Sequence, residues 1–490
     1  MKEIPNIPIS NSECVLIFPF HHRFDELKQA EKADNWKTWL IRLNSSEKKD
    51  INDATSYFQP SIRKTLFPEM SPPIKPQSTR HLTFMLGNEP FSCDFTLQFL
   101  KKDVGYIEGI FNGHISFIDA YIFDDKTGLL AININPQCDS LHQLVDFLRV
   151  IRMLLPTYNG IEPPHLNLSV FPNSKKIDSM NDFINFLLEN IIMINFGDED
   201  GRVENKQVYP PISKEEMERC YTFTYAQISE DENISKTDIA GLEMRDLWLY
   251  EIGTMTPIGS EDILNDEYVS RVVKEYRIAI WESCQGIALN NNVAFLEFSD
   301  SPQINKTFFH TITRDYFFLY IFCLCQKIKL LKLQDNLINF DQNVYEISNR
   351  IQDLLGQKVK FQNRFWLADV TKNHIREEIY KKYQYGLGTN LLYEYISNKI
   401  DDLYKYHCTI ANGDQINQTL KLNRVIKIIS AVLGIPLILI SFLNINIRDY
   451  TNKEGLSLGS AFALLLGFII LGVGIALLIN WRDNKKTKSG

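Results

Sequence analysis

The chain has 490 residues, which is enough for roughly two to four domains and a substantial hydrophobic core. Its 52 basic and 60 acidic residues give a formal net charge of −8, so binding to nucleic-acid polymers, which needs a basic footprint, is not expected. The eight cysteines are scattered without the paired spacing of a zinc site and are typical of buried thiols.

Residues 1–307 are predicted to form an α/β (α+β) domain. Short apolar runs bounded by turn residues predict strands at 14–20, 81–86, 94–100, 105–111, 115–123, 128–135 and 220–228. Strands are also predicted within 278–298, where Asn290-Asn291-Asn292 is expected to form a turn. The runs 115–123 and 128–135 flank a polar turn and are expected to form a hairpin. Residues 139–155 predict a helix, since Asp139 or Ser140 is a suitable cap and Pro156 ends the segment. Strands mixed with helices indicate a layered domain.

From residue 308 the strand signals end, and the region 308–427 is predicted to be helical. Helices are expected at about 308–338, 343–383 and 389–427. In the last of these, the residues Ile396, Ile400, Leu403, His407 and Ile410 follow one another at intervals of four and three. This period is typical of a helix that packs along a neighbour. The only weak point before the next apolar segment is Asn412-Gly413, so a long stalk helix is predicted to continue into that segment.

Two uncharged apolar segments near the C-terminus predict a transmembrane hairpin. Segment 428–447 is twenty residues long, about 30 Å as a helix, and segment 456–481 is also uncharged. The connecting outer loop 448–455 has no net charge, whereas basic residues precede the first segment and dominate the tail 482–490. By the positive-inside rule, both termini are expected in the cytoplasm of a protein that crosses a bacterial-type inner (cell) membrane twice, with the lipid bilayer as a partner.

The polar and small residues of the first apolar segment fall on one helical face. They continue the period of the stalk as Asn423, Lys427, Ser430, Gly434, Leu437, Ser441 and Asn444. A polar stripe in hydrocarbon must face protein or water. One interpretation is close packing of helices through small residues; the other is a pore in which Asn444 or Asn446 forms a ring of amide oxygens. A pore would require a homo-oligomer, because two segments per chain do not enclose an ion path.

Three short stretches in this region are informative together. They are Asn423-Arg424-Val425-Ile426-Lys427, Ile435-Pro436-Leu437 and Asn444-Ile445-Asn446. Their order resembles that in the CorA family of magnesium channels, in which the third stretch reads Gly-Met-Asn, so only Asn446 matches there. The resemblance implies a funnel-shaped homopentamer whose first membrane segments line a pore for Mg2+ or another divalent cation, with Asn446 binding the hydrated ion and the stalk helices controlling its opening.

The part of the chain before the apolar segments is longer than expected for that family and has an additional strand group near 220–298. In this respect the chain resembles the long variant associated with type III CRISPR systems, which implies a membrane effector of antiviral defence that a nucleotide messenger opens. Three hypotheses remain open: a housekeeping channel for divalent cations, this defence effector, and a non-conducting membrane-anchored scaffold or receptor.

Few other residues suggest a binding site. Arg149 and Arg152, three apart on a predicted helix, are candidates for holding a phosphate of a regulatory nucleotide, although solvated or ion-paired arginines are the favoured alternative. Asp414 is a candidate for a cation-attracting ring in an oligomer, with an ordinary exposed acid as the favoured alternative. The sequence has no Walker loop, dinucleotide-binding glycine pattern, metalloprotease helix or nucleophile elbow, so no catalytic residue and no enzyme activity are expected.

Overall fold

The computed structural model describes most of the first 409 residues and a few beyond them. The described residues are 6–22, 35–43, 48, 49, 52, 55–70, 79–99, 109–123, 125–154, 163–169, 177–192, 220–229, 238, 239, 242–256, 265–298, 307–338, 347–409, 419, 421–423, 425, 426, 466, 467, 470 and 474. The chain divides into two compact units, of which the first contains 1–343 and 352–400, and the second contains 344–351 and 401–490. The sheet and the site discussed below lie in the first unit.

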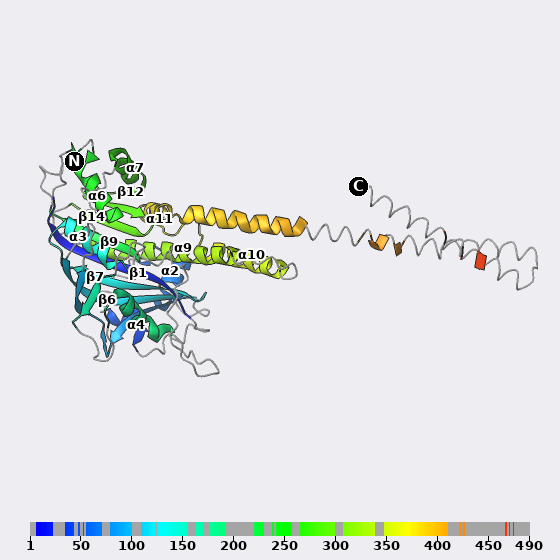
Figure 1. Cartoon of the computed structure of the whole chain (residues 1–490), viewed down its shortest axis with the longest axis horizontal. Coiled ribbons are helices and arrows are strands. Elements are labelled where there is room, and N and C mark those ends of the chain that lie inside the picture. Colours follow the sequence, from blue (N-terminus) through cyan, green and yellow to red (C-terminus); the bar gives the residue numbers. More distant parts are fainter. Residues whose placement is uncertain are drawn as a thin grey trace, which may run out of the picture. The chain divides into compact units, whose positions relative to one another are not determined.

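The described residues of the first unit are built around one mixed sheet of twelve strands (Figure 1). Its strands are β1 (Ile9–His21), β2 (Trp36–Thr38), β3 (Thr79–Leu86), β4 (Glu89–Pro90), β5 (Cys93–Phe99), β6 (Gly109–Phe123), β7 (Thr127–Pro136), β8 (His165–Leu168), β9 (Tyr221–Ile228), β12 (Arg277–Ile278), β13 (Cys284–Leu289) and β14 (Asn292–Glu297). A separate pair consists of β10 (Asp238–Ile239) and β11 (Leu242–Glu243).

The strand order is β12-β13-β14-β9-β1-β7-β6-β3-β2, with β4 beside β3 and β5 between β6 and β8. The pairs are antiparallel except for β14 and β9, which run parallel. Strand β6 is long enough to pair with β5 along its first half and with β3 along its second half. The hairpin β6–β7 therefore connects both halves of the sheet.

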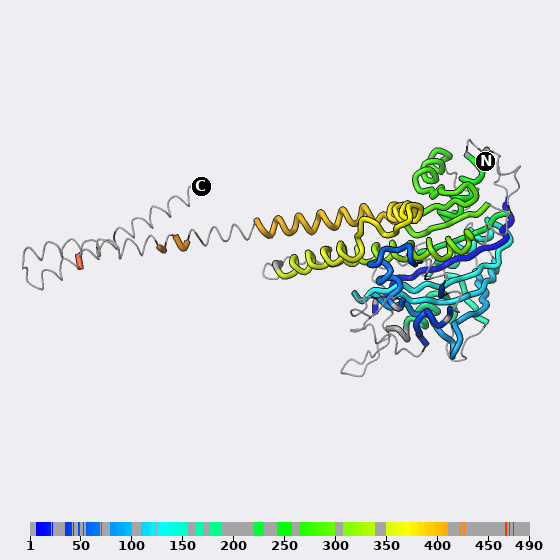
Figure 2. Tube along the Cα trace, turned by 180° about the vertical axis from the view of Figure 1, so that it is seen from behind, coloured from blue at the N-terminus to red at the C-terminus, as the bar shows by residue number. Residues whose placement is uncertain are grey.

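Helices cover both faces of this sheet (Figures 1 and 2). They are α2 (Pro60–Leu66), α3 (Leu141–Ile151), α4 (Met180–Ile192), α6 (Met244–Thr254), α7 (Asp266–Tyr276), α9 (Phe317–Ile338), α10 (Ile347–Arg364) and α11 (His374–Gly386), with short 3-10 helices η2 (Trp39–Arg42) and η3 (Pro68–Met70) and a π-helix, η5 (Thr311–Tyr316). One core lies between the sheet and α3, α4, α6 and α7. The other lies between the opposite face and α2, α9 and α11, with the end of α10.

The two-sided burial follows from the strand sequences. In β1, Leu16 and Phe18 point into the core with α3, while Val15 and Ile17 point into the core with α9. Alternate side chains of a strand point to opposite faces, so a strand that is apolar at every position must be covered on both sides. The apolar run predicted as a buried strand at 14–20 is confirmed as part of β1.

Several predicted elements are confirmed and two are corrected. The runs 105–111 and 115–123, predicted as separate strands, belong in their described part to one strand, β6. The runs 115–123 and 128–135 form the hairpin β6–β7, and the helix predicted at 139–155 is α3, with Ser140 as its cap. The single helix predicted at 343–383 is wrong, because the structure has α10 and α11 with a break between Arg364 and His374. The break is stabilised by Glu377, whose carboxylate accepts hydrogen bonds from the backbone N–H groups of two residues before α11, each at 3.0 Å.

The predicted CorA-like fold class and the multi-pass inner-membrane location are corrected. Within the part of the chain that the structure describes, none of the helices combines the length and the apolar character needed to cross a bilayer. The described fold is α/β, with a large mixed sheet between helices. The predicted transmembrane helices 428–447 and 456–481, the loop 448–455 and the tail 482–490 lie outside the described residues, apart from 466, 467, 470 and 474.

The prediction of membrane-spanning helices was based on hydropathy, and hydropathy does not distinguish a helix buried in a protein core from one buried in a membrane. A helix that is hydrophobic all round is found in protein cores as well as in membranes. Helix α9 illustrates the first case: it has 22 residues, most of them apolar, and they pack against the sheet. The predictions of a membrane channel and of ion transport, which depended on the two apolar segments, are not retained.

Candidate functional site: a lysine-lined pocket

A pocket opens between the β6–β7 turn, α9 and the end of α10. Its volume is about 320 Å³, and it is lined by Asp125, Lys126, Lys329, Lys332, Leu333, Asn336, Gln357, Lys360, Phe361 and Phe365. Four of these residues are lysines and one is an aspartate, so positive charges outnumber negative charges by three. A concave site of this size with a few converging polar groups is typical of binding sites for small molecules.

Helical spacing brings these side chains together. On α9, Lys329, Lys332 and Asn336 are three and four residues apart and share one face of the helix. On α10, Gln357 and Phe361 are four residues apart and face α9, as the hydrogen bond from Asn336 Nδ2 to Gln357 Oε1 (3.0 Å) shows. Figures 1 and 2 show these two helices side by side.

Lys329 is the innermost cation of the pocket and is only 6 % exposed. Its Nζ lies 2.6 Å from Asp125 Oδ2 and over two aromatic rings, 4.9 Å from the centre of Phe123 and 4.5 Å from that of Phe365. A buried ammonium group is costly unless a carboxylate and ring faces compensate for the lost water. Lys329 is therefore held in place by one carboxylate and two ring faces at the inner end of the pocket.

The β6–β7 turn is fixed to α9 by two lysines. Lys332 Nζ donates a hydrogen bond to the backbone oxygen of Asp125, while the Asp125 carboxylate pairs with Lys329. The carboxylate also accepts hydrogen bonds from Thr127, at 2.6 Å from its hydroxyl and 3.3 Å from its backbone N–H. Lys126, which lies between Asp125 and Thr127, adopts a left-handed backbone conformation with φ of 68°, which is uncommon for a residue with a side chain.

The pKa of Asp125 reports the strength of this positive field. Burial by itself raises the pKa of this carboxyl group, but the charge and hydrogen bond of Lys329 lower it, with smaller contributions from Thr127 and Lys332, to about 2. The pocket therefore stabilises a negative oxygen group strongly. A ligand phosphate has several charged acceptor oxygens, which are stabilised by the same positive charges and hydrogen-bond donors.

The predicted ligand residues Arg149 and Arg152 lie elsewhere. Both belong to the end of α3, which covers the face of the sheet opposite to α9, so the structure does not bring them to the lysine pocket. Arg149 lies near Asp146, and Arg152 is buried, with its backbone oxygen accepting a hydrogen bond from the N–H of Cys220 at 3.4 Å. Their role in holding a phosphate stays a prediction.

The predicted pore and cation residues are almost all outside the described part of the chain. This applies to Asp414, Ser430, Gly434, Leu437, Ser441, Asn444 and Asn446. Asn423 is described as helical and exposed. Among the described residues, no group of three or more His, Cys, Asp and Glu side chains could hold a metal ion. The divalent cation expected from the sequence is therefore not assigned to any described side chain.

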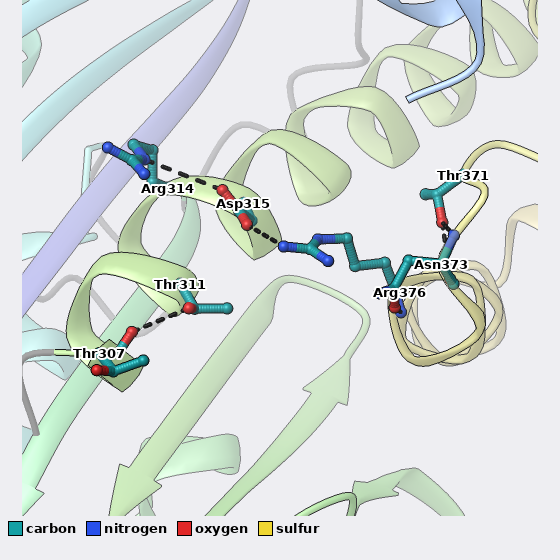
Figure 3. A network of polar contacts seen from close by, with 7 residues as sticks. All are labelled: Thr307, Thr311, Arg314, Asp315, Thr371, Asn373 and Arg376. Carbon is teal, nitrogen blue, oxygen red and sulfur yellow. Dashed lines mark hydrogen bonds and ion pairs between the residues drawn. The ribbon is translucent and has the colours of Figure 1, made fainter. Parts of the chain in front are cut away.

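A second polar network joins the π-helix η5 to α11 and is shown in Figure 3. Arg376 donates to the carboxylate of Asp315, and Arg314 Nε lies 3.9 Å from the other oxygen of this carboxylate. The Arg376 guanidinium also stacks over the ring of Tyr57, 3.9 Å from its centre. Because Asp315 is buried and paired on both sides, this network is a structural connection between two helices rather than an open site.

A third arrangement has the order of a catalytic triad. Ser92 Oγ lies 2.9 Å from His114 Nε2, and His114 Nδ1 lies 2.7 Å from Asp94 Oδ1. However, the side chains of His114 and Asp94 are 40 % and 74 % exposed. Solvent screens charges at such a surface and weakens the activation of a nucleophile. The lysine pocket, which is concave and contains a buried lysine, is the stronger candidate.

Sequence reasoning missed the pocket. The signal on α9 is visible, because Lys329 and Lys332 lie three residues apart in the second half of a mostly apolar helix. The turn at Asp125 was visible too, but about two hundred residues separate it from the lysines in sequence, and only the paired sheet brings them together.

Comparison of the sequence with known proteins does not assign this chain to a family. No protein-family model matches the chain, and no curated protein is similar to it in sequence. The resemblance to the CorA family gains no support from these comparisons. Any assignment of function therefore depends on the geometry and chemistry of the site itself.

Proposed function

We propose that the described α/β part of the chain is a receptor for a phosphate-bearing ligand, and that the ligand binds in the lysine pocket. The observation that carries this proposal is the convergence of four lysines from three separate elements on one cavity. Ammonium groups are suitable partners for phosphate oxygens, and a net excess of positive charge accelerates the arrival of an anion.

Within this class, a nucleotide fits the lining best. Phe361 and Phe365 are buried and contribute aromatic surface to the pocket, while Asn336 and Gln357 supply amide groups at its rim. Aromatic side chains favour the flat face of a nucleobase, and amides can donate to or accept from its edge. A regulatory nucleotide was also one of the hypotheses from the sequence, although the arginines expected to bind it lie on the opposite face of the sheet.

The test is titration of the full chain with ATP and with inorganic tripolyphosphate, measured by calorimetry. Lys360→Gln and Lys332→Gln should each weaken the binding of both probes about tenfold or more, because each removes a charge-assisted contact worth roughly 1.5–3 kcal/mol. Lys381→Gln is the matched control: Lys381 is exposed on α11 outside the pocket, and its replacement should leave the affinity unchanged.

The comparison of the two probes tests the nucleotide class. Tighter binding of ATP than of tripolyphosphate supports recognition of a base by the aromatic and amide groups. Equal affinities would restrict the site to phosphate chains. If neither probe binds, or if Lys381→Gln weakens binding as much as Lys360→Gln does, the proposal is wrong.

A further inference from the structure

The Asp125 carboxylate is paired with one of the four lysines that line the pocket. It lies 2.6 Å from Lys329 Nζ, and Lys329 is the innermost lysine of the pocket. The other cations are more accessible: Lys332 is half-buried, and Lys126 and Lys360 are exposed at the rim. A phosphate that enters the pocket therefore meets three outer lysines first and competes with Asp125 for the fourth.

We infer that Asp125 is an internal competitor of the ligand, and that ligand binding releases the β6–β7 turn from α9. This inference rests on the proposed phosphate site. A phosphate and a carboxylate close to the same ammonium group repel each other, so the two anions are not expected to hold Lys329 together. Binding energy from the outer lysines is then available to displace the carboxylate.

The backbone conformation of the turn depends on contacts of Asp125 that such a displacement would remove. Lys126 has a left-handed backbone, which is maintained only while its surroundings enforce it, and the Asp125 carboxylate is one of the groups that does so through Thr127 and Lys329. Strands β6 and β7 remain paired through nine residue pairs further along, so the turn can move without opening the sheet. The structural consequence of binding is therefore confined to the turn and to the face of α9 beneath it.

The experiment compares the wild type with Asp125→Asn by calorimetric titration with tripolyphosphate. Asparagine keeps the shape of the side chain but removes the competing charge, so the affinity should increase by about tenfold. At the same time, the melting temperature without ligand should fall, because Lys329 loses its buried counter-ion. A purely structural role of Asp125 would lower both the stability and the affinity. Glu282→Gln, an exposed carboxylate outside the pocket, is the control for net charge and should leave the affinity unchanged.

A measurement on the wild type complements the variant. Tripolyphosphate should increase hydrogen exchange at the backbone N–H of Thr127, which is bonded to the Asp125 carboxylate at 3.3 Å. Slower exchange there, or an affinity of Asp125→Asn equal to or lower than that of the wild type, would overturn the competition while leaving the phosphate site intact. Absence of tripolyphosphate binding to the wild type would instead reject the site and the inference together.

Discussion

At the scale of single residues, the charged side chains inside this protein have different surroundings and therefore different roles. Asp125 and Asp315 lie beside cations that contact them directly, Lys329 and Arg376 respectively. Asp146 on α3 has a weaker balance: burial raises its pKa to about 6, while the charges of Arg149 and His142 lower it and that of Glu251 raises it further. Such differences are not visible in a sequence, where all three are simply aspartates.

The surroundings of Asp146 predict a pH dependence of stability. A carboxyl group whose pKa is raised from 3.8 to about 6 in the folded state contributes stability below pH 4, and this contribution is lost as the pH rises through 6. His142, whose pKa is raised by its hydrogen bond to Glu251, acts in the same direction, since its contribution is present below pH 6.5 and is lost above its folded pKa. Removal of the Asp146 charge should therefore have its largest effect on the free energy of unfolding at neutral pH.

We expect Asp146→Asn to become more stable relative to the wild type as the pH is raised from 4 to 7, by about 1 kcal/mol after allowance for its partial exposure. The measurement is urea unfolding of both proteins at several pH values. Asp139→Asn, which removes an exposed carboxylate just before the same helix, should show no such trend. A difference between Asp146→Asn and the wild type that is constant with pH would contradict the prediction.

At the scale of elements, local signals were sufficient for some segments. The hairpin β6–β7 could be predicted, because two apolar runs flank a polar turn, and α3 could be predicted from its cap and the proline after it. The break between α10 and α11 could not, because residues 365–373 contain no glycine or proline and are fixed by contacts with distant residues. Among these contacts, the backbone N–H of Gln59 donates to the oxygen of Val370 at 2.9 Å.

The end of α11 predicts a specific effect of a glycine substitution. A Cβ atom added to Gly386 would lie 2.3 Å from the backbone oxygen of Ala288 in β13, and backbone atoms cannot move aside cheaply. Gly386→Ala should therefore force α11 away from β13 and lower the free energy of unfolding by about 1–3 kcal/mol. Denaturant unfolding of the full chain measures this effect.

Gly356 in α10 supplies the matched control, because a Cβ atom there would meet nothing within 4 Å. Alanine is favoured over glycine in a helix interior by about 0.5–1 kcal/mol, so Gly356→Ala should stabilise the protein. The same substitution thus has opposite signs in two helices. Destabilisation by both variants would show that helix contacts with the sheet do not decide the outcome at Gly386.

At the scale of the whole molecule, the topology depends on pairings between distant parts of the sequence. Strand β9 pairs with β1 over registers such as Thr224 with Cys14, and β14 joins β9 in parallel. Periodicity identifies strands but does not select their partners, so the presence of strands and helices in the first 307 residues was accessible from the sequence, whereas the strand order was not. The candidate site could not be predicted for the same reason, because its lysines and the β6–β7 turn are brought together only by the tertiary fold.

The shared sheet predicts that its two cores unfold together. Leu148 on α3 and Leu324 on α9 are both fully buried, but they lie in different cores on opposite faces of the sheet. Because every central strand contributes side chains to both cores, loss of either core exposes the strands that support the other. Leu148→Ala and Leu324→Ala should each cost about 2–5 kcal/mol and lower the midpoint of the same thermal transition, measured by calorimetry. Two transitions, each moved by only one of the variants, would instead show that the faces fold as independent units.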